Sequence, residues 1–426
     1  MMPKWKNNKI VQNAGWLMFG KVVQMLINLV VGLLTARYLG PSNYGIINYA
    51  VAYTGFFYSI CNLGINSILV KEFLESPKQD GEILGTTLLL QAVSSALSAI
   101  AIVCIAYIAD DGDAIIMAVV FLTSIGMVFR LFEAFNYWFQ SRLQSKVTAM
   151  ASLAAYAITA AYKVILLIQG KNVVWFAFAT AVDYICLAVF LLIAYKKYGG
   201  GRLRISLKRG KGLLRKSCHF ILPGLMVAIY AQTDKIMLKQ MISEAEIGYY
   251  STAVSLCSVW CFVLSAIIDS LYPEIAKAHK TDKKLYIQRN KQLYAIVFYM
   301  SMGVSLAITC LAKTAVYILY GGVYLPAVTP LRVITWYTAF SYLGVARNAW
   351  IVCENQQKHL IWVYASAAVS NVLLNLLLIP RFGATGAAAA SLLAQVVTTM
   401  IAPFFINGLR ENAKLMVDAI LLRDVF

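Results

Sequence analysis

The sequence predicts an all-α polytopic membrane protein, with twelve transmembrane helices in two pseudo-symmetric six-helix lobes around a central cavity. Three observations lead to this prediction. Of the 426 residues, 60% are hydrophobic and only 13% are charged, whereas soluble domains contain about 25% charged residues. Apolar stretches of about 20 residues, long enough to cross ~30 Å of hydrocarbon, recur along the whole chain. Weak similarity between the two halves indicates an internal repeat.

The predicted spans divide equally between the two halves. Those of the first half are 13–36, 44–69, 84–108, 114–141, 147–169 and 173–195. Those of the second half are 217–239, 247–271, 292–312, 327–353, 359–379 and 384–408. The corresponding ranges are an N-terminal lobe over 1–196, a basic cytoplasmic linker over 197–216, a C-terminal lobe over 217–408 and a cytoplasmic interfacial tail over 409–426. Residues 313–324 are too few to cross the bilayer and are predicted to form a re-entrant or interfacial turn.

A tight hairpin is predicted where LLTARYLGPSNYGIINYA (33–50) briefly interrupts the apolar pattern. Gly40 suits the position that ends one helix, and Pro41 suits the first turn of the next. Arg37 and Tyr38 would then lie at headgroup depth, where such side chains anchor helices. The first two spans are therefore expected to join directly on the outer side of the membrane.

The net charge of +18 is distributed by loop, which indicates the topology. Lys and Arg residues concentrate in alternate loops, including 196–216 and 277–291. The basic residues of the opposite loops are few, namely Arg37, Lys171, Lys239, Lys313 and Arg381. An excess of basic residues marks the cytoplasmic side, which therefore holds both termini. Anionic lipid is the expected partner of this surface, and nucleic acid is not expected.

No metal site and no catalytic site is predicted. Cys257 and Cys261 share a helix face without a histidine or carboxylate arranged as a co-ligand. His219, His279 and His359 fall at cytoplasmic helix ends, which excludes an intramembrane histidine relay. The outer loops are too short to group the catalytic side chains of a membrane polymerase or glycosyltransferase. The protein is therefore not expected to be an enzyme.

An internal repeat relates the two halves at two offsets. A shift of 203 residues places YGIINYA (44–50) on IGYYSTA (247–253) and matches Gly45 with Gly248. A shift of 212 residues relates the ends of the fourth and tenth spans: Asn136, Trp138, Gln144 and Lys146 fall on Asn348, Trp350, Gln356 and Lys358. Six spans per half give both halves the same orientation, so the repeat is parallel, about an axis near the membrane normal.

Polar and charged side chains within the spans are the candidate site residues, because lipid-facing helix surfaces must be apolar. The predicted substrate-binding residues are Lys21, Arg130, Arg347, Gln24, Asn28, Asn62, Asn66 and Tyr137. The predicted sites for a coupling ion, H⁺ or Na⁺, are Glu133, Asp183, Asp269 and Asp234. A charge at the bilayer centre costs roughly 2.5–3.5 kcal/mol on insertion scales, which favours a functional role. The basic members of the set suit an anionic substrate with a large hydrophilic part.

Two alternatives stay open for these side chains. Arg130 and Glu133 are three residues apart and could simply pair with each other. The serines of the eighth span could serve helix packing only. A hinge is predicted at Pro223 and Gly224 in the seventh span, since proline removes a backbone hydrogen bond and bends a helix.

Seven segments, in order along the chain, resemble those of one family. In the first half they are NAGWLMFGK, TARYLGPSNYGIINYA and LGINSILVKE. In the second half they are PGLMVAIYAQTDKIML, EIGYYSTA, LYGGVYLPA and GATGAAAASLL. The family is that of the Wzx-type O-antigen repeat-unit flippases, in the multidrug/oligosaccharidyl-lipid/polysaccharide (MOP) exporter superfamily. The resemblance covers nearly the whole chain, and Lys21 matches the lysine that usually follows the first glycine-rich stretch of the family.

The resemblance implies a transport function. Such flippases move undecaprenyl-diphosphate-linked oligosaccharide repeat units from the cytoplasmic to the outer leaflet of the bacterial inner membrane, for the synthesis of surface polysaccharide such as capsule or the O-antigen of lipopolysaccharide. The implied partners are this lipid-linked oligosaccharide, membrane lipids and the polysaccharide polymerase machinery, with no cofactor apart from a coupling ion. Lys21, Arg130 and Arg347 would attract the diphosphate while the lipid tail stays in the bilayer. The rival prediction is a multidrug/cation antiporter of the same superfamily.

Overall fold

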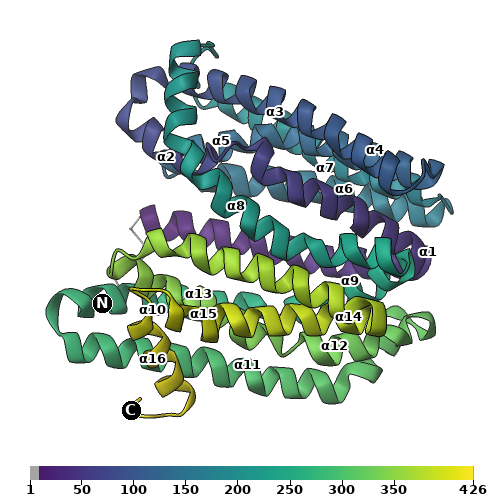
Figure 1. The fold of residues 1–426 in the computed structure, drawn as a ribbon. Coiled ribbons are helices and arrows are strands. Elements are labelled where there is room, and N and C mark those ends of the chain that lie inside the picture. Colours follow the sequence, from purple (N-terminus) through teal and green to yellow (C-terminus); the bar gives the residue numbers. More distant parts are fainter. Residues whose placement is uncertain (1–8, 426) are drawn as a thin grey trace, which may run out of the picture. The chain divides into compact units, whose positions relative to one another are not determined.

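The computed structural model describes residues 9–425, and within this range the chain is helical without a β-strand (Figure 1). The chain forms two compact units. The first contains the chain through Leu39 and Ile46–Ala228, and the second contains Gly40–Gly45 and the chain from Ile229 onward. The boundary after Ala228 falls inside one helix, α8 (Leu207–Met241). The predicted all-α class is confirmed.

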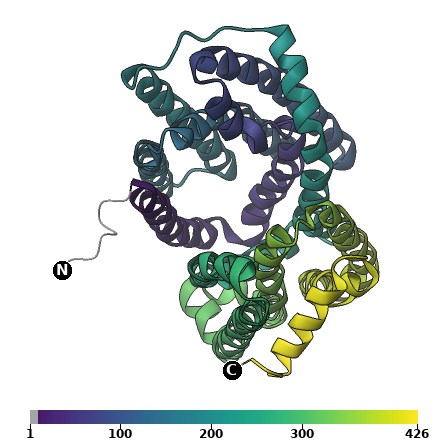
Figure 2. The same ribbon diagram turned by 90° about the vertical axis from the view of Figure 1, so that its left-hand side faces the viewer.

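The first unit holds most of α1 (Lys9–Cys61) and ends within α8. Between them lie α2 (Asn66–Glu75), η2 (Pro77–Gln79), α3 (Asp80–Ala109), α4 (Ala114–Phe129), η3 (Arg130–Glu133), α5 (Ala134–Ser141), α6 (Ser145–Ile168) and α7 (Val173–Lys197). Many of these helices are seen close to end-on in Figure 2, side by side. Their common core includes Trp138, which is completely buried, and the aromatic rings of Phe135 and Tyr195.

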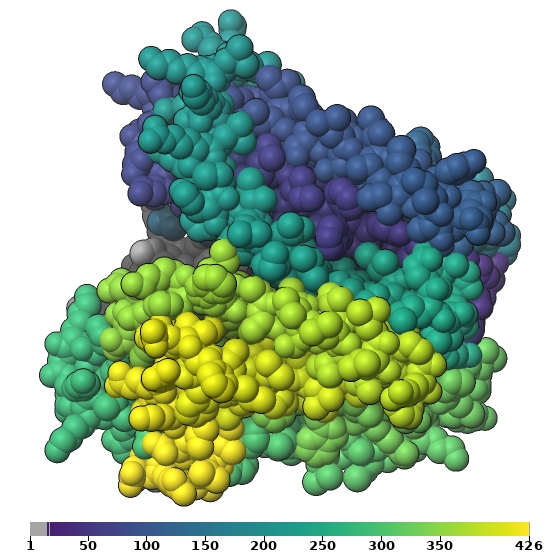
Figure 3. Space-filling model, in the orientation of Figure 1, coloured from purple at the N-terminus to yellow at the C-terminus, as the bar shows by residue number. Residues whose placement is uncertain are grey.

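The second unit begins within α8 and continues to the end of the described chain. Its elements are α9 (Glu244–Ser258), α10 (Cys261–Thr281), α11 (Lys283–Tyr320), η4 (Gly322–Ala327), α12 (Val328–Ile334), α13 (Tyr337–Cys353), η5 (Gln357–His359), α14 (Leu360–Val396), η6 (Val397–Ile401), α15 (Ala402–Phe405) and α16 (Arg410–Ile420). The segment η6 is a π-helix. The carboxyl-terminal segment, yellow in Figure 3, lies at the surface of this unit.

The helices of the described chain account for the twelve predicted spans, although some helical stretches contain two spans and some spans consist of two helices. Eight helical stretches of the described chain are long and apolar enough to cross a membrane. Two of them contain two predicted spans each, because the backbone turns at Gly40 (φ 71°) and at Gly383 (φ 54°). One more span is the pair α9 and α10, bent by 41°. The last is α12 followed by α13, interrupted after Ile334.

The predicted turn over 313–324 is wrong for most of its length. Helix α11 continues without a break for 38 residues and ends only at Tyr320, before Gly321 (φ 90°). At 1.5 Å per residue a helix of this length measures about 57 Å, well beyond the ~30 Å of hydrocarbon. The helix therefore projects past the membrane core rather than turning back into it.

The repeat at offset 203 corresponds to a reciprocal backbone contact in the second unit. A Cβ atom added to Gly45 would overlap the carbonyl oxygen of Glu244, and one added to Gly248 would overlap that of Pro41. The same shift of 203 residues maps Pro41 onto Glu244. The two helix starts thus contact each other through equivalent atoms, which requires a residue without a side chain on both sides.

The repeat at offset 212 is also visible in backbone conformation. Leu143 (φ 55°) and Asn355 (φ 53°) both adopt the left-handed conformation, which is uncommon for residues other than glycine. Trp138 and Trp350, five residues earlier in each half, are 0% and 2% exposed. Each half therefore ends this span with a buried tryptophan and the same left-handed turn.

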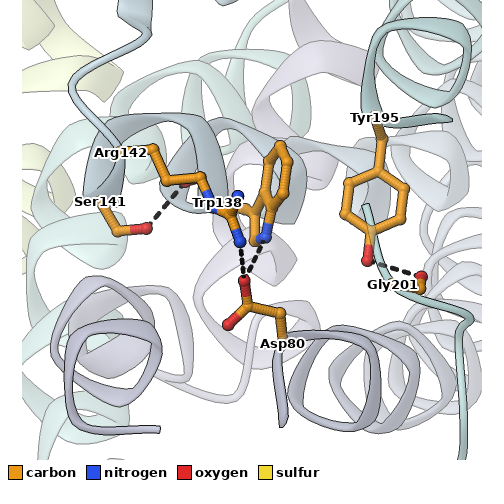
Figure 4. Close-up of polar contacts among 6 residues, drawn as sticks. All are labelled: Asp80, Trp138, Ser141, Arg142, Tyr195 and Gly201. Atoms are coloured by element: carbon orange, nitrogen blue, oxygen red, sulfur yellow. Dashed lines mark hydrogen bonds and ion pairs between the residues drawn. The ribbon is translucent and has the colours of Figure 1, made fainter. Parts of the chain in front are cut away.

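An ion pair between the exposed Arg142 and the buried Asp80 joins the start of α3 to the end of α5 (Figure 4). Arg142 Nη2 lies 2.5 Å from Asp80 Oδ2, and Trp138 Nε1 donates to the same oxygen at 2.8 Å. In the second half, the residue that the shift of 212 aligns with Arg142 is Glu354, whose Oε1 lies 3.4 Å from His279 Nε2. Each half thus has a side-chain contact at this position, an arginine–aspartate ion pair in the first half and a histidine–glutamate pair in the second.

The first part of the predicted linker packs against α3. Cβ atoms on Gly81 and Gly85 would overlap the carbonyl oxygens of Arg202 and Arg204. The amide of Arg204 donates to Gly81 O at 3.1 Å, and Tyr195 Oη donates to Gly201 O at 2.9 Å (Figure 4). From residue 207 the linker is helical and forms the start of α8. The glycines of α3 form a groove that holds this backbone in place.

The predicted interfacial tail includes α16, which packs against α11. Leu415 and Met416 join the hydrophobic core of the second unit. Lys291 Nζ on α11 lies 3.0 Å from Asp418 Oδ2, and Tyr299 Oη donates to Ile420 O at 2.7 Å. The tail is therefore part of the packed structure of this unit.

Candidate functional site

Lys21 and Gln24, two predicted substrate-binding residues, line the same polar cavity in the first unit. The cavity has a volume of about 180 Å³, and its walls are Gly20, Lys21, Gln24, Asn136, Gln140, Ser145, Thr148, Ala149 and Ser152. A Cβ on Gly20 would lie 3.2 Å from that of Ala149, so α1 and α6 approach closely beside it. Lys21 is exposed and forms no ion pair with any residue that the structure describes. Its ammonium group is available to an anionic ligand.

Arg130 and Glu133, predicted for substrate and ion, are paired with each other. Arg130 Nε lies 3.4 Å from Glu133 Oε1, because the 3₁₀ turn η3 brings residues three apart onto one face. The guanidinium carbon lies 3.6 Å from the centroid of the Tyr58 ring and 5.2 Å from that of Tyr184. Tyr58 Oη donates to Glu133 Oε2 at 2.8 Å. The structure thus supports the pairing alternative, within an aromatic cage that favours a cation.

Asn62 and Asn66, predicted to bind substrate, stabilise a break in the second span. Residues 62–65 leave the helical path, with Gly64 at φ 66°. Asn62 Oδ1 accepts from the Gly64 amide at 2.7 Å, and Asn66 Oδ1 accepts from Gln91 Nε2 at 2.9 Å. Broken spans need such partners, because freed backbone groups find no water in the bilayer core.

Two other predicted residues of the first unit lie near this region. Asp183 on α7 is half-buried, accepts a hydrogen bond from Thr159 Oγ1 at 3.3 Å and interacts electrostatically with Lys163. Tyr137 on α5 packs at the edge of the hydrophobic core of the unit. Both have satisfied structural contacts within the unit.

Arg347 on α13 is buried, with 3% of its surface exposed. Its Nη1 donates to the carbonyl oxygen of Thr398 at 3.4 Å, and its Nε has no partner among the described residues. Thr398 lies in the π-helix η6, where the backbone departs from regular α-helical hydrogen bonding. A π-helical carbonyl, rather than an acidic side chain, compensates this cation.

Asp234 on α8 is the centre of a buried polar cluster in the second unit. The carboxylate is 3% exposed and accepts hydrogen bonds from Tyr250 Oη and Ser391 Oγ, both at 2.5 Å. Its other oxygen accepts from Asn371 Nδ2 at 2.9 Å and from Asn375 Nδ2. The cluster borders a cavity of about 290 Å³ whose walls include Tyr230, Tyr337, Tyr342, Cys257 and Gln395. This is the best-enclosed of the predicted ion sites.

The remaining predicted residues lie apart from these clusters. Asn28 on α1 and Asp269 on α10 are exposed. Pro223 and Gly224 lie within α8, which stays helical across them. A Cβ on Gly224 would lie 3.1 Å from Ser59 Oγ, so this glycine permits close packing of α8 on α1. The predicted hinge remains a prediction.

Comparison with known families identifies the protein class. Residues 10–279, more than half of the chain, match the family described as "Polysaccharide biosynthesis protein". The chain belongs to this family. The family resemblance expected from the sequence motifs is thereby confirmed. No curated protein sequence matches the chain.

Solved structures show the fold that this polysaccharide biosynthesis protein shares. A structure described as lipid II flippase MurJ in an inward closed conformation matches with a TM-score of 0.73 and 12% identity, over 96% of this chain and 91% of that chain. An inward-facing multidrug resistance MATE transporter of the MOP superfamily matches at 0.68 and 13%, over 93% and 96%. A MOP superfamily transporter from Pyrococcus furiosus matches at 0.66 and 13%, over 96% of each. The protein is a multi-pass membrane protein with the MOP transporter fold.

Sequence reasoning missed the partners of Asp234 in this polysaccharide biosynthesis protein. Asn371 and Asn375 are two polar residues in the apolar first part of α14, four positions apart and hence on one face. The spacing of these asparagines within a predicted span could have indicated that they face the protein interior, since intramembrane polar groups rarely face lipid. Their convergence on Asp234, 137 and 141 positions away in sequence, could not be inferred from spacing.

Proposed function

We propose that the protein is a flippase for undecaprenyl-diphosphate-linked oligosaccharide repeat units. It carries them from the cytoplasmic to the outer leaflet of the bacterial inner membrane by alternating access, for the synthesis of surface polysaccharide such as O-antigen or capsule. Both termini lie in the cytoplasm, and the protein catalyses no covalent reaction. Its partners are the lipid-linked oligosaccharide, membrane lipids and the polysaccharide polymerase machinery.

The unpaired ammonium group of Lys21 beside a polar cavity is the observation that carries this proposal. A lysine inside an apolar span is costly unless it serves a pathway or binds a partner. Amide and hydroxyl groups line the same cavity, which suits a ligand that is both anionic and rich in hydroxyl groups. Membership of the polysaccharide biosynthesis family supports the same substrate class.

A coupling cation binds at Asp234 in this proposal. Hard cations take oxygen ligands, and here a carboxylate lies beside hydroxyl groups and asparagine amides that can rotate to present oxygen. Lys235 interacts electrostatically with Asp234, and this neighbouring positive charge favours a singly charged ion such as Na⁺ or H⁺. Replacing Na⁺ or removing a proton gradient should slow transport by the wild type and leave Asp234→Asn indifferent. Asp269→Asn, on an exposed carboxylate, should keep the dependence.

Reconstituted vesicles provide the direct test. Undecaprenyl-diphosphate oligosaccharide placed in one leaflet should become accessible to an impermeant glycosidase on the other side only when the protein is present. Lys21→Ala should slow this transfer at least tenfold, about 1.4 kcal/mol in activation free energy, while Lys313→Ala, on an exposed lysine of α11, should not. Wild-type transfer in Lys21→Ala would remove Lys21 from the site.

A multidrug/cation antiporter is the second candidate, and the cavity next to Asp234 favours it. A buried carboxylate surrounded by Tyr230, Tyr337 and Tyr342 is suited to an organic cation. Export of a cationic dye by the same vesicles, without any transfer of lipid-linked glycan, would decide for the antiporter.

A further inference from the structure

The cavity beside Lys21 contains more polar groups than an anion site requires. Besides Lys21, the side chains of Gln24, Asn136, Gln140 and Ser152 line it, from helices α1, α5 and α6. None of these four makes a hydrogen bond to any residue that the structure describes. Asn136 Oδ1 is buried in this unsatisfied state.

Helix packing does not explain these side chains. Small polar residues that hold helices together in membranes do so by hydrogen bonds across the interface. In the same wall the hydroxyl of Thr148 donates to Ser145 O of its own helix at 3.0 Å, so it is satisfied without a ligand. Asn136 Oδ1 is buried without a partner among the described residues, and a buried polar atom of this kind calls for a ligand or water. The exposed amide of Gln140 also has no partner among these residues.

The size and chemistry of the cavity fit one sugar ring. Its volume of about 180 Å³ equals that of about six water molecules at roughly 30 Å³ each. A carboxamide donates and accepts at once, so it can bind neighbouring hydroxyl groups of a sugar. The only charged side chain in the wall is that of Lys21, so the ring must carry, or be joined to, one anionic group.

We infer that this cavity binds a single sugar ring with an attached anion, through Asn136, Gln140, Gln24 and Ser152 on the hydroxyl groups and Lys21 on the anion. The inference rests on the proposed function and extends it, because it assigns recognition of the glycan to one pocket of the first unit. The anion has two chemical sources, a phosphate at the anomeric carbon or a carboxylate on the ring.

Binding to the wild-type protein in lipid nanodiscs tests the inference without requiring transport. The probes are glucose 1-phosphate, glucuronate, glucose and inorganic phosphate, each titrated and followed by saturation-transfer NMR. A probe that combines ring and anion should bind at least tenfold more tightly than glucose or phosphate alone. Preference for glucose 1-phosphate assigns the anion to the lipid diphosphate, and preference for glucuronate assigns it to an acidic sugar.

Variants locate the binding. Asn136→Leu should raise the Kd of the preferred probe at least tenfold. Ser152→Ala, which adds no bulk, should raise it about threefold. Asn348→Leu, at the exposed repeat-related position of α13, should bind as the wild type does. Monodisperse elution and an unchanged Tm establish that each variant is folded.

Two results would overturn the inference: equal binding of phosphate and of the ring-bearing probes, or wild-type binding by folded Asn136→Leu and Ser152→Ala. Transport of lipid-linked glycan in vesicles despite either result would leave the proposed function standing. Binding of the ring-bearing probe without any glycan transport would keep the pocket and refute the flippase.

Discussion

The three cations of the candidate site residues differ in how their charge is compensated. Arg130 has a carboxylate partner and two aromatic rings. Arg347 is buried against a backbone carbonyl. Lys21 has neither, and it is the one that borders an open polar cavity. All three residues became candidates because they are basic residues within predicted spans. Their surroundings in the structure distinguish Lys21, which has no counter-ion among the described residues, from Arg130 and Arg347, which have partners.

Removing the partner of Arg130 should destabilise the first unit. Glu133→Gln leaves a cation without its counter-ion and Tyr58 Oη with a weaker acceptor, so we expect a loss of about 1–2 kcal/mol in unfolding free energy. The measurement is thermal unfolding in detergent. Glu75→Gln is the control, because its pair with Lys71 is 52% and 77% exposed and such pairs contribute little. Equal Tm values for both variants would mean that the half-buried pair of Arg130 and Glu133 adds nothing to stability.

At the scale of helical elements, glycines set how closely neighbours approach. The reciprocal contact of Gly45 and Gly248 fixes the start of α9 against residues Gly40–Gly45, within the second unit. The glycines of α3 hold the linker backbone in the same way. Both contacts follow from the absence of a side chain, which no residue other than glycine provides.

Adding one methyl group at the reciprocal contact should therefore be costly. We expect Gly45→Ala and Gly248→Ala each to lose roughly 1–3 kcal/mol, the usual range for overpacking, measured by denaturation in detergent. The double variant should lose less than the sum, since both substitutions displace the same pair of elements. Gly303→Ala is the control, because that helical glycine has open space around its Cα and alanine is the better helix former. A stable Gly45→Ala protein would contradict the close contact.

Some structural elements could be predicted from the local sequence, and others could not. The turn at Gly40 followed from a glycine–proline pair, and both repeat offsets reappear as matched backbone features. The continuation of α11 to Tyr320 was missed, because a hydropathy window ends a span where the bilayer ends and not where the helix does. The hydrogen bond from the Gly64 amide to Asn62 was not predicted, since a polar residue in a span shows its type but not its hydrogen-bond partner.

For the whole molecule, composition and loop charge were sufficient to predict a multi-pass helical membrane protein, and family and fold comparisons agree. The candidate site could be predicted only in part. Lys21 and Gln24 were found together, whereas Asp234 was found without its four hydrogen-bond donors. Convergence of distant helices is set by tertiary packing, which sequence spacing within one helix does not encode.

Transport by the whole molecule should respond to membrane voltage. A diphosphate with two negative charges that leaves a negative interior gains about 5 kcal/mol per 100 mV. Collapsing the potential in reconstituted vesicles should therefore slow outward transfer, as measured by glycosidase access under valinomycin-clamped potassium gradients. Transfer at the same rate at every potential would show that no net charge moves with the substrate.

The packing of α16 against α11 has a consequence for how the protein is synthesised and folded. Met416 and Val425 complete a core that also contains Trp350, so the second unit lacks part of its interior until α16 and the residues after it have been synthesised. The core around Trp138 draws on residues 65–195 and is available while later segments are still on the ribosome. The two halves, although related by a repeat, therefore complete their native packing at different points of synthesis: the first core needs residues only up to Tyr195, whereas the second also needs α16.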